Sequence, residues 1–222
     1  MSSIRAVLLD LDGTLYDRAA ALRASAADQH ARLTDKLGNL GREPFVDRFM
    51  TLDANGHGAK RVAYETILGE AGAERGWAGS LTLDYERRFA AHCHPPDDLH
   101  PTLDALRARG VRLGVVTNGR TAMQTATIAA LGLAGRFDSI LISQAEGMRK
   151  PDRAIFRRAL ARLGCAPSAA VFVGDHPEAD IAGAARAGLR TVWRRTPSFS
   201  PPEAPDAAIE RLGELPAILA AW

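Results

Sequence analysis

Short apolar runs recur along the chain, and segments with helical spacing separate them. The first run covers residues 4–9 and ends at Asp10; the others cover residues 111–117, 139–143, 171–174 and 190–193. Such short, nearly continuous runs predict strands that are buried on both faces. Helices are predicted at residues 101–109, 121–131, 151–163 and 178–187, each followed by glycine. The alternation predicts right-handed βαβ units and a parallel sheet.

Residues 17–96 interrupt this alternation. They contain no convincing strand, and their apolar residues keep a helical spacing in four successive stretches. We therefore expect two parts: an α/β core formed by residues 1–16 and 97–222, and an inserted four-helix domain formed by residues 17–96. The core is expected to be a doubly wound, Rossmann-like parallel sheet.

Composition limits the choice of partner and compartment. The 28 basic and 26 acidic residues leave a formal charge of +2, which gives no electrostatic reason to expect nucleic acid or an anionic membrane as a partner. The start of the chain lacks a signal-peptide pattern, and no apolar run approaches the roughly 18 residues of a membrane span. We expect a cytoplasmic protein with no membrane partner; its oligomeric state is not indicated.

Two acids follow the first predicted strand, in the segment Asp10-Leu11-Asp12-Gly13-Thr14. Ligands of open parallel sheets bind beyond this end of the strands. Carboxylates two residues apart in extended chain project to one side and repel each other unless a cation or a shared proton intervenes. The pair therefore indicates a metal site or two carboxylates in different protonation states, although a turn with two solvated acids has the same pattern.

A second acidic pair, Asp175 and Asp180, follows the strand predicted at residues 171–174. Asp175 could simply cap the next helix, a common role for aspartate. Placed on the same sheet edge as Asp10, however, it would complete a set of oxygen ligands suited to Mg²⁺. His176 is an unsuitable ligand for such an ion and is expected to pack or to face solvent.

Polar residues also follow the strand at 111–117 and precede the helix at 151–163. Thr117 and Asn118 offer a hydroxyl and backbone N–H groups that can hold an oxyanion, although an ordinary Asn-Gly turn is equally compatible. Lys150 is one of only three lysines beside 25 arginines. A compact ammonium suits a site where a point charge approaches a phosphate or a carboxylate.

The order of these features along the chain resembles the four motifs of the haloacid dehalogenase-like (HAD) hydrolase superfamily. The matching residues are Asp10 with Asp12, Thr117, Lys150, and Asp175 with Asp180. The helical insert resembles the type I (C1) cap of the phosphatase-type branch. The resemblance covers nearly the whole chain.

This resemblance implies a Mg²⁺-dependent phosphatase that hydrolyses a small phosphorylated metabolite through an aspartyl-phosphate. Asp10 would be the nucleophile, and Asp12 the general acid and base. Mg²⁺ would be held by Asp10, by the backbone carbonyl of Asp12 and by Asp175. Asp180 would support the ion through water or through contacts to its ligands.

By the same resemblance, Thr117, the Asn118 backbone and Lys150 would bind the phosphoryl oxygens. A 2-haloacid dehalogenase uses the same fold, but its counterpart of Asp12 is typically not aspartate and it needs no Mg²⁺. A sugar-phosphate mutase shares all four motifs. A non-catalytic phosphoacceptor of the signalling type also pairs acids with a lysine, but it is much shorter and has no helical insert.

Substrate choice is expected to lie in the inserted domain. In the segment from Asn55 to Arg61, glycines flank His57, and the cations Lys60 and Arg61 follow. The segment could reach a substrate, or it could simply join two helices. His92, Cys93 and His94 are interpreted as part of a linker rather than as a zinc site.

Overall fold

The structure, a computed structural model, describes residues 4–222. The chain divides into two compact units: an α/β unit of Met1–Asp17 and Pro95–Trp222, and a helical unit of Arg18–His94. These boundaries lie within two residues of the expected ones. Interpretation of the helical unit as a cap remains a prediction. Within the described residues, none of the helices is long and apolar enough to cross a membrane.

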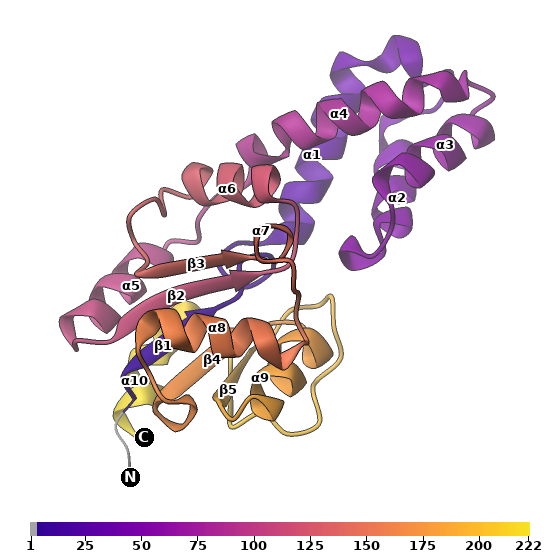
Figure 1. Cartoon of the computed structure of the whole chain (residues 1–222). Helices are drawn as coiled ribbons and strands as arrows, with labels where there is room; N and C mark the ends of the chain where they lie inside the picture. The colour runs from indigo at the N-terminus through magenta and orange to yellow at the C-terminus, as the bar shows by residue number, and fades with distance from the viewer. Residues whose placement is uncertain (1–3) are drawn as a thin grey trace. The chain divides into compact units, whose positions relative to one another are not determined.

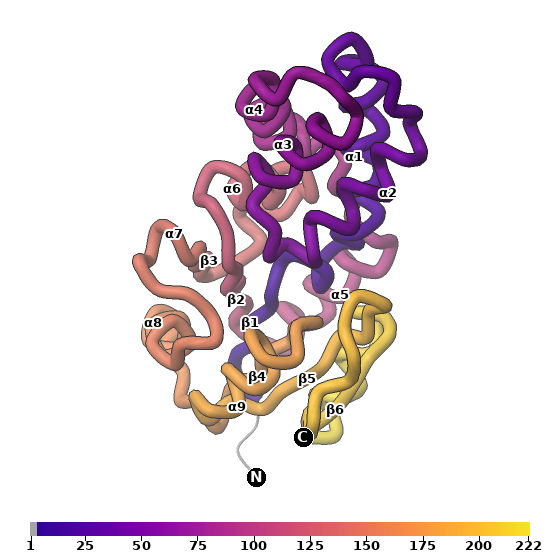
Figure 2. The backbone as a smooth tube through the Cα atoms, turned by 90° about the vertical axis from the view of Figure 1, so that its right-hand side faces the viewer, coloured from indigo at the N-terminus to yellow at the C-terminus, as the bar shows by residue number. Residues whose placement is uncertain are grey.

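The α/β unit is built on a parallel sheet, as the sequence predicts, and this sheet has six strands. Figure 2 shows the strands in their spatial order β3-β2-β1-β4-β5-β6. Their bounds are β1 Ala6–Leu9, β2 Arg112–Thr117, β3 Ser139–Ile142, β4 Ala170–Gly174, β5 Arg190–Arg194 and β6 Ala207–Ile209. The order reverses on either side of β1, which is the topological switch point where open α/β sheets bind ligands.

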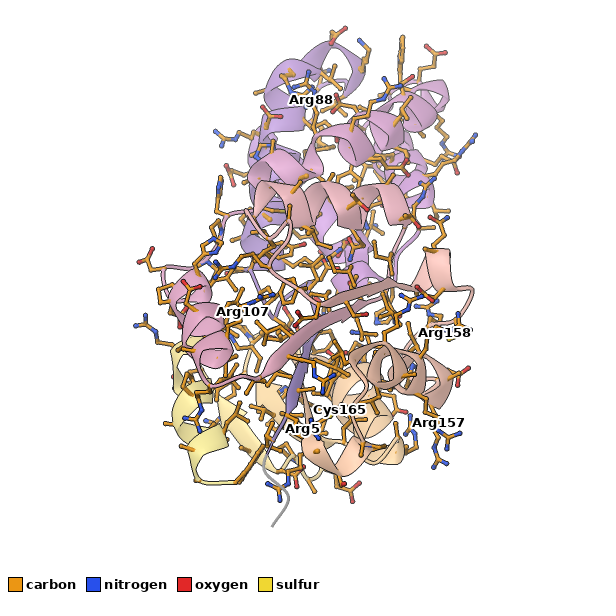
Figure 3. The ribbon with its side chains drawn as sticks, turned by 60° about the vertical axis from the view of Figure 1, so that its left-hand side comes forward. Arg5, Arg88, Arg107, Arg157, Arg158 and Cys165 are labelled. Atoms are coloured by element: carbon orange, nitrogen blue, oxygen red, sulfur yellow. The ribbon has the colours of Figure 1, made fainter. Side chains whose placement is uncertain are left out.

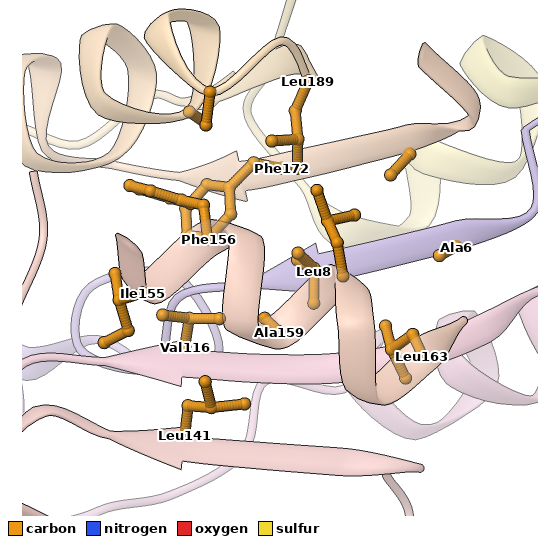
Figure 4. Packing of buried hydrophobic residues seen from close by; sticks show 14 residues of the cluster. Ala6, Leu8, Val116, Leu141, Ile155, Phe156, Ala159, Leu163, Phe172 and Leu189 are labelled. Atoms are coloured by element: carbon orange, nitrogen blue, oxygen red, sulfur yellow. The ribbon is translucent and has the colours of Figure 1, made fainter. Parts of the chain in front are cut away.

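Helices cover both faces of this sheet (Figure 1). The α-helices described in this unit are α5 Leu99–Ala108, α6 Thr121–Ala130, α7 Ser143–Glu146, α8 Arg153–Leu163, α9 Gly183–Arg186 and α10 Leu215–Ala220. Leu8, Val116 and Phe172 pack with Ile155 and Phe156 of α8 in one buried cluster (Figure 4). Because strand side chains alternate, the residues between them point to the opposite face of the sheet, against which α5 packs. The charged residues of α8 stay exposed, as Figure 3 shows for Arg157 and Arg158.

Most predicted elements agree with the structure to within one or two residues at each end, and three of the differences have a local cause or change the type of element. The helix predicted from residue 151 begins at Arg153, because the side chain of Asp152 accepts a hydrogen bond from the N–H of Ala154 and caps it. The helix predicted at 178–187 is instead a π-helical segment, Pro177–Ala182, followed by the short α9. The strand predicted to reach residue 143 ends at Ile142, where α7 begins.

The helical unit contains α1 Arg18–Arg32, α2 Arg42–Asp53, α3 Lys60–Glu70 and α4 Ala78–Arg88. Its core is aromatic: the ring of Phe49 lies 5.0 Å from that of Tyr64 and 5.9 Å from that of Tyr85. A chain of polar contacts leads from the buried Tyr64 to the half-buried Asp84: the Tyr64 hydroxyl donates to Gln29, and Gln29 donates to Asp84. Phe49 and Tyr64 therefore stabilise the core of the helical unit by packing.

Candidate active site

Asp10 lies directly after β1, at the end of the sheet that the sequence predicts for ligand binding. Its Oδ1 lies 2.5 Å from Nζ of Lys150, and the same ammonium lies 2.7 Å from Oδ1 of Asp180. All three side chains are at most 8% exposed. The structure thus brings together three sequence-predicted residues that are as many as 170 positions apart, as the difference between residues 10 and 180 shows.

Asp175 completes an acidic cluster around Asp10. Single carboxylate oxygens of Asp10, Asp175 and Asp180 all lie within 4.8 Å of one another. Trp193 of β5 donates from Nε1 to the main-chain oxygen of Asp175 at 2.9 Å, which fixes this loop. Gly13 has φ +80°, and a Cβ atom there would lie 2.2 Å from Oδ2 of Asp175. Only glycine therefore lets the loop after β1 pass this carboxylate.

Burial governs the protonation of the acids in this site. It raises the pKa of Asp175 to about 9, and the charges of Asp10 and Asp180 add to the rise. It also raises the pKa of Asp10 to about 7, although the Lys150 ammonium opposes the change. Burial tends to lower the pKa of Lys150, but Asp10 and Asp180 outweigh it and the pKa rises. The ammonium therefore stays charged while the carboxylates favour protons.

The donor set fits a hard divalent cation. Asp10, Asp12, Asp175 and Asp180 contribute negative charges that act on one another, and Lys150 is the cation that opposes them most strongly at Asp10 and Asp175. Carboxylate oxygens are the ligands that Mg²⁺ prefers, and a cation can take the place of the protons that burial favours. Lys150 donates to one oxygen of Asp10, whereas both oxygens of Asp180 accept hydrogen bonds, Oδ1 from Lys150 and Oδ2 from the N–H of His176. Asp10 and Asp175 are therefore the acids that could hold such an ion directly.

Asp12 is held from two sides. The Tyr16 hydroxyl donates to its Oδ1, and Nε2 of Gln124 lies 2.5 Å from its Oδ2. The same Nε2 lies 2.7 Å from Oγ1 of Thr117, which is completely buried at the end of β2. Asp12 and Thr117, both predicted as site residues, are therefore linked through one side chain.

Asn118 holds the segment that carries Lys150. Its Nδ2 donates to the main-chain oxygen of Lys150 at 3.0 Å, and its Oδ1 accepts from the Lys150 N–H at 2.9 Å. The Lys150–Pro151 peptide bond is cis. The side chain of Asn118 is thus used for positioning, which leaves only its backbone for the phosphate contact that the resemblance implies.

His176 has a capping role that the sequence did not suggest. Its Nδ1 accepts hydrogen bonds from the N–H groups of Glu178 and Ala179, each at 3.2 Å, and its ring lies 4.6 Å from that of Phe199. His176, rather than Asp175, therefore caps the helical segment that follows. The alternative interpretation of Asp175 as a helix cap is wrong.

The predicted selection residues lie in the helical unit. Lys60 forms an ion pair with Asp53, which also pairs with Arg18 at 2.8 Å. Arg61 pairs with Glu65 at 2.9 Å, and its side chain is 72% exposed. His57 belongs to the loop that joins α2 to α3, which Asp53 anchors by accepting from the N–H of Gly56.

Sequence reasoning missed three of these residues: Gln124, Tyr16 and Asp53. Gln124 sits seven residues beyond Thr117, so a helix that begins after the Thr117 turn can direct it back to the site. Tyr16 follows Asp12 by four residues and bonds to it locally. Nothing in the sequence indicated that Asp53 is buried, since an acid at the end of a helix is usually solvated.

Comparisons with known proteins define the class. A family model for haloacid dehalogenase-like hydrolases matches residues 4–188. A glyceraldehyde 3-phosphate phosphatase of Methanopyrus kandleri is 32% identical over 96% of this chain and 95% of its own length. A ribulose-1,5-bisphosphate 5-phosphatase of Halopiger xanaduensis is 34% identical over 91% of this chain and 87% of its own length.

Among solved structures, a 2-haloacid dehalogenase of Pseudomonas syringae pv. Tomato DC3000 aligns with a TM-score of 0.66 and 33% identity, covering 99% of both chains. The chain belongs to the haloacid dehalogenase-like hydrolases. The recognition made from the four motifs is therefore confirmed, and the curated relatives reported above are phosphatases.

Proposed function

We propose that this chain is a Mg²⁺-dependent phosphatase that hydrolyses a small phosphorylated metabolite through an aspartyl-phosphate on Asp10. The observation that carries the proposal is the buried cluster of Asp10, Asp175 and Asp180 around Lys150. The acidic side chains of this site outnumber the Lys150 ammonium, so their negative charge would repel an anionic substrate unless a divalent cation were present. The names of the curated relatives support the same chemistry.

In the first step, a carboxylate oxygen of Asp10 forms a bond to phosphorus while the bond from phosphorus to the ester oxygen breaks. Asp12 donates its proton to the departing oxygen. In the second step, Asp12 removes a proton from a water molecule, whose oxygen bonds to phosphorus. The bond between phosphorus and Asp10 then breaks, which releases inorganic phosphate and restores both carboxyl groups.

Thr117, the Asn118 backbone and Lys150 are proposed to bind the phosphoryl oxygens. Lys150 stays charged beside Asp10 and can offset negative charge as it moves onto those oxygens. Asp10, the main-chain oxygen of Asp12 and Asp175 would hold Mg²⁺, with Asp180 assisting through water. When bound, Mg²⁺ supplies positive charge that orients the phosphoryl group and stabilises the transition state.

Dehalogenation is the second candidate, because one similar solved structure is a 2-haloacid dehalogenase. That chemistry requires Asp10 as nucleophile but, by the resemblance, neither Asp12 nor Mg²⁺. A carboxylate at position 12, held by Gln124, and the acid cluster around Asp175 favour phosphoryl transfer. A mutase would use the same site but return an isomeric ester.

The test is a panel of phosphomonoesters assayed with Mg²⁺ and again with a chelator. Release of inorganic phosphate that requires Mg²⁺ is the expected result. Chelator-resistant chloride release from a 2-chloro acid, without phosphate release from any ester, would establish the dehalogenase function instead. Formation of an isomeric ester in place of free phosphate would identify a mutase, and a phosphorylated protein that does not turn over would identify a signalling phosphoacceptor.

Selection among esters is proposed to involve His57, Lys60 and Arg61 of the helical unit. Arg61 keeps most of its guanidinium in solvent and has one weak exposed partner. Lys60 is already neutralised by Asp53, so its contribution is expected to be smaller.

A further inference from the structure

Gln124 of α6 contacts the proposed acid–base residue and the proposed phosphate-binding hydroxyl with a single nitrogen. Its Nε2 lies 2.5 Å from Oδ2 of Asp12, 2.7 Å from Oγ1 of Thr117 and 3.3 Å from the main-chain oxygen of Asn118. Only 5% of the residue is exposed. Because Asn118 O can only accept a hydrogen bond, the atom that faces these three oxygens is the donating nitrogen of the amide.

This contact determines the direction in which the Thr117 hydroxyl can donate. A hydroxyl has one hydrogen and two lone pairs, and an amide nitrogen can only donate to it. Gln124 therefore occupies a lone pair of Oγ1 and leaves the hydrogen free to point elsewhere. Within residues 4–222, the acceptor found for that hydrogen is the main-chain oxygen of Asn118, at 3.5 Å. A hydrogen bond that long is weak, so a phosphoryl oxygen would compete successfully for the hydrogen.

The backbone beside Thr117 leaves room for this side chain. A Cβ atom at Gly119 would lie 2.9 Å from both Cγ and Cδ of Gln124. Any larger residue would therefore push the amide away from its three acceptors. Gly119 thus permits the contact, in addition to the turn that the sequence suggested.

We propose that Gln124 is a positioning residue that presents the Thr117 hydroxyl as a hydrogen-bond donor to the transferring phosphoryl group and keeps the Asp12 side chain beside it. This inference rests on the proposed phosphatase function. It deepens that function by adding a residue that acts on the phosphoryl group through Thr117.

The test is a double-mutant cycle with Gln124→Met and Thr117→Val, read out as the competitive inhibition constant of inorganic phosphate. Methionine matches glutamine in length but cannot donate to Oγ1. In the wild-type background, Gln124→Met is expected to raise the inhibition constant about fivefold to tenfold. In the Thr117→Val background the same change is expected to alter it by less than about twofold, because the hydroxyl is already absent. The inhibition constant reports phosphate binding and therefore excludes any effect on proton transfer by Asp12.

Gln144→Met is the matched control. Gln144 accepts a hydrogen bond from the N–H of Thr121 at 2.8 Å, so it also supports α6, but it is exposed and makes no contact with Asp12 or Thr117. It should leave the inhibition constant unchanged. Thermal unfolding of every variant checks folding, and Gln124→Leu replaces Gln124→Met if the latter does not fold.

The outcomes separate the two proposals. If wild type releases phosphate and Gln124→Met has the same effect in both backgrounds, or no effect in either, the inference about Gln124 is wrong while the phosphatase function stands. If wild type neither hydrolyses phosphate esters nor binds inorganic phosphate, the proposed function fails and the inference fails with it.

Discussion

The α/β unit and the helical unit each bury aspartate in an ion cluster, but the two clusters balance their charge differently. In the helical unit, Asp53 is paired with both Arg18 and Lys60. Burial raises its pKa, but these two partners outweigh burial and keep the pKa of Asp53 below its ordinary value. In the α/β unit, burial prevails and the pKa values of Asp10 and Asp175 rise to about 7 and about 9.

The difference separates a structural cluster from a functional one. Arg18 and Lys60 together neutralise the Asp53 carboxylate, so no further cation is needed to stabilise its negative charge. The acids around Asp10 outnumber the lysine that pairs with them, and this imbalance is unfavourable for folding in the absence of a further cation. Such strongly perturbed groups concentrate at functional sites, and a bound cation would relieve the excess.

Loss of the nucleophile should have the largest effect. Asp10→Asn is expected to lower kcat by about 10⁴-fold or more, because an amide oxygen cannot form the covalent intermediate. The protein should remain folded, since Lys150 keeps its ion pair with Asp180. Steady-state kinetics and thermal unfolding measure the two effects. Wild-type turnover of an aryl phosphate by this variant would eliminate Asp10 as nucleophile.

Removal of Mg²⁺ should have the next largest effect on activity. A chelator is expected to lower turnover by about 10²-fold or more, and excess Mg²⁺ should restore it. Mg²⁺ should also raise the midpoint of thermal unfolding in wild type, because an ion that binds only the folded state stabilises it. Asp175→Asn should weaken both responses, whereas Asp53→Asn should leave the Mg²⁺ dependence unaltered.

The stability of the two clusters should respond differently when one acid is removed. Asp53→Ala leaves Arg18 and Lys60 without their shared partner and removes the bond to the N–H of Gly56. Because those cations are 20% and 15% exposed, water can partly solvate them, and we expect a loss of about 2 kcal/mol in the free energy of unfolding. The control is Asp47→Ala, whose pair with Arg23 is exposed and should contribute less than about 1 kcal/mol. Equal losses in the two variants would show that the Asp53 cluster stabilises the fold no more than an exposed ion pair does.

The pH dependence of stability should have opposite signs for the two clusters. In metal-free protein, Asp10 and Asp175 bind protons more tightly when folded than when unfolded, so their contribution is present at low pH and lost as pH rises through about 7 and about 9. Asp53 has a lowered pKa, so its contribution is present above its ordinary pKa and lost as pH falls. Chemical denaturation between about pH 5 and about pH 9 should show decreasing stability in metal-free wild type and a flatter profile in Asp175→Asn. A stability that rises with pH over this range would contradict the raised pKa values of Asp10 and Asp175.

Substitution of an exposed selection residue should have the smallest effect. Arg61→Ala is expected to change the free energy of unfolding by less than about 0.5 kcal/mol, since its pair with Glu65 is solvated. Its kcat on a small aryl phosphate should stay within about twofold of wild type, whereas the ranking of larger esters by kcat/KM should change. An unchanged ranking would remove Arg61 from substrate selection.

Much of the sheet and its motifs could be predicted from the sequence because parallel strands impose simple rules. Buried strands appear in the sequence as apolar runs. Polar residues at their carboxyl ends lie together at one edge of the sheet, as Asp10, Thr117 and Asp175 do. Helix starts were less predictable: the cap by Asp152 and the π-helical turn after His176 depend on local hydrogen bonds that apolar spacing does not reveal.

The supporting contacts of the site were largely beyond prediction for a different reason. Gln124 reaches Asp12 only because α6 begins just beyond the end of β2 and directs this side chain back to the site, and the glutamine in the sequence gives no indication of these partners. Asp53 likewise becomes a buried ion pair only through α1 and α3, which supply Arg18 and Lys60.

The most direct test of the account is to trap the covalent intermediate. Wild-type protein should be mixed with Mg²⁺ and a phosphate ester that it hydrolyses, and the reaction should be quenched in acid within milliseconds. The peptides of the quenched protein are then analysed by mass spectrometry. A phosphoryl group on Asp10, absent when the chelator is present and absent in Asp10→Asn, is the predicted result. Rapid phosphate release with no modified Asp10 peptide, from an Asp10→Asn variant as well as from wild type, would contradict it.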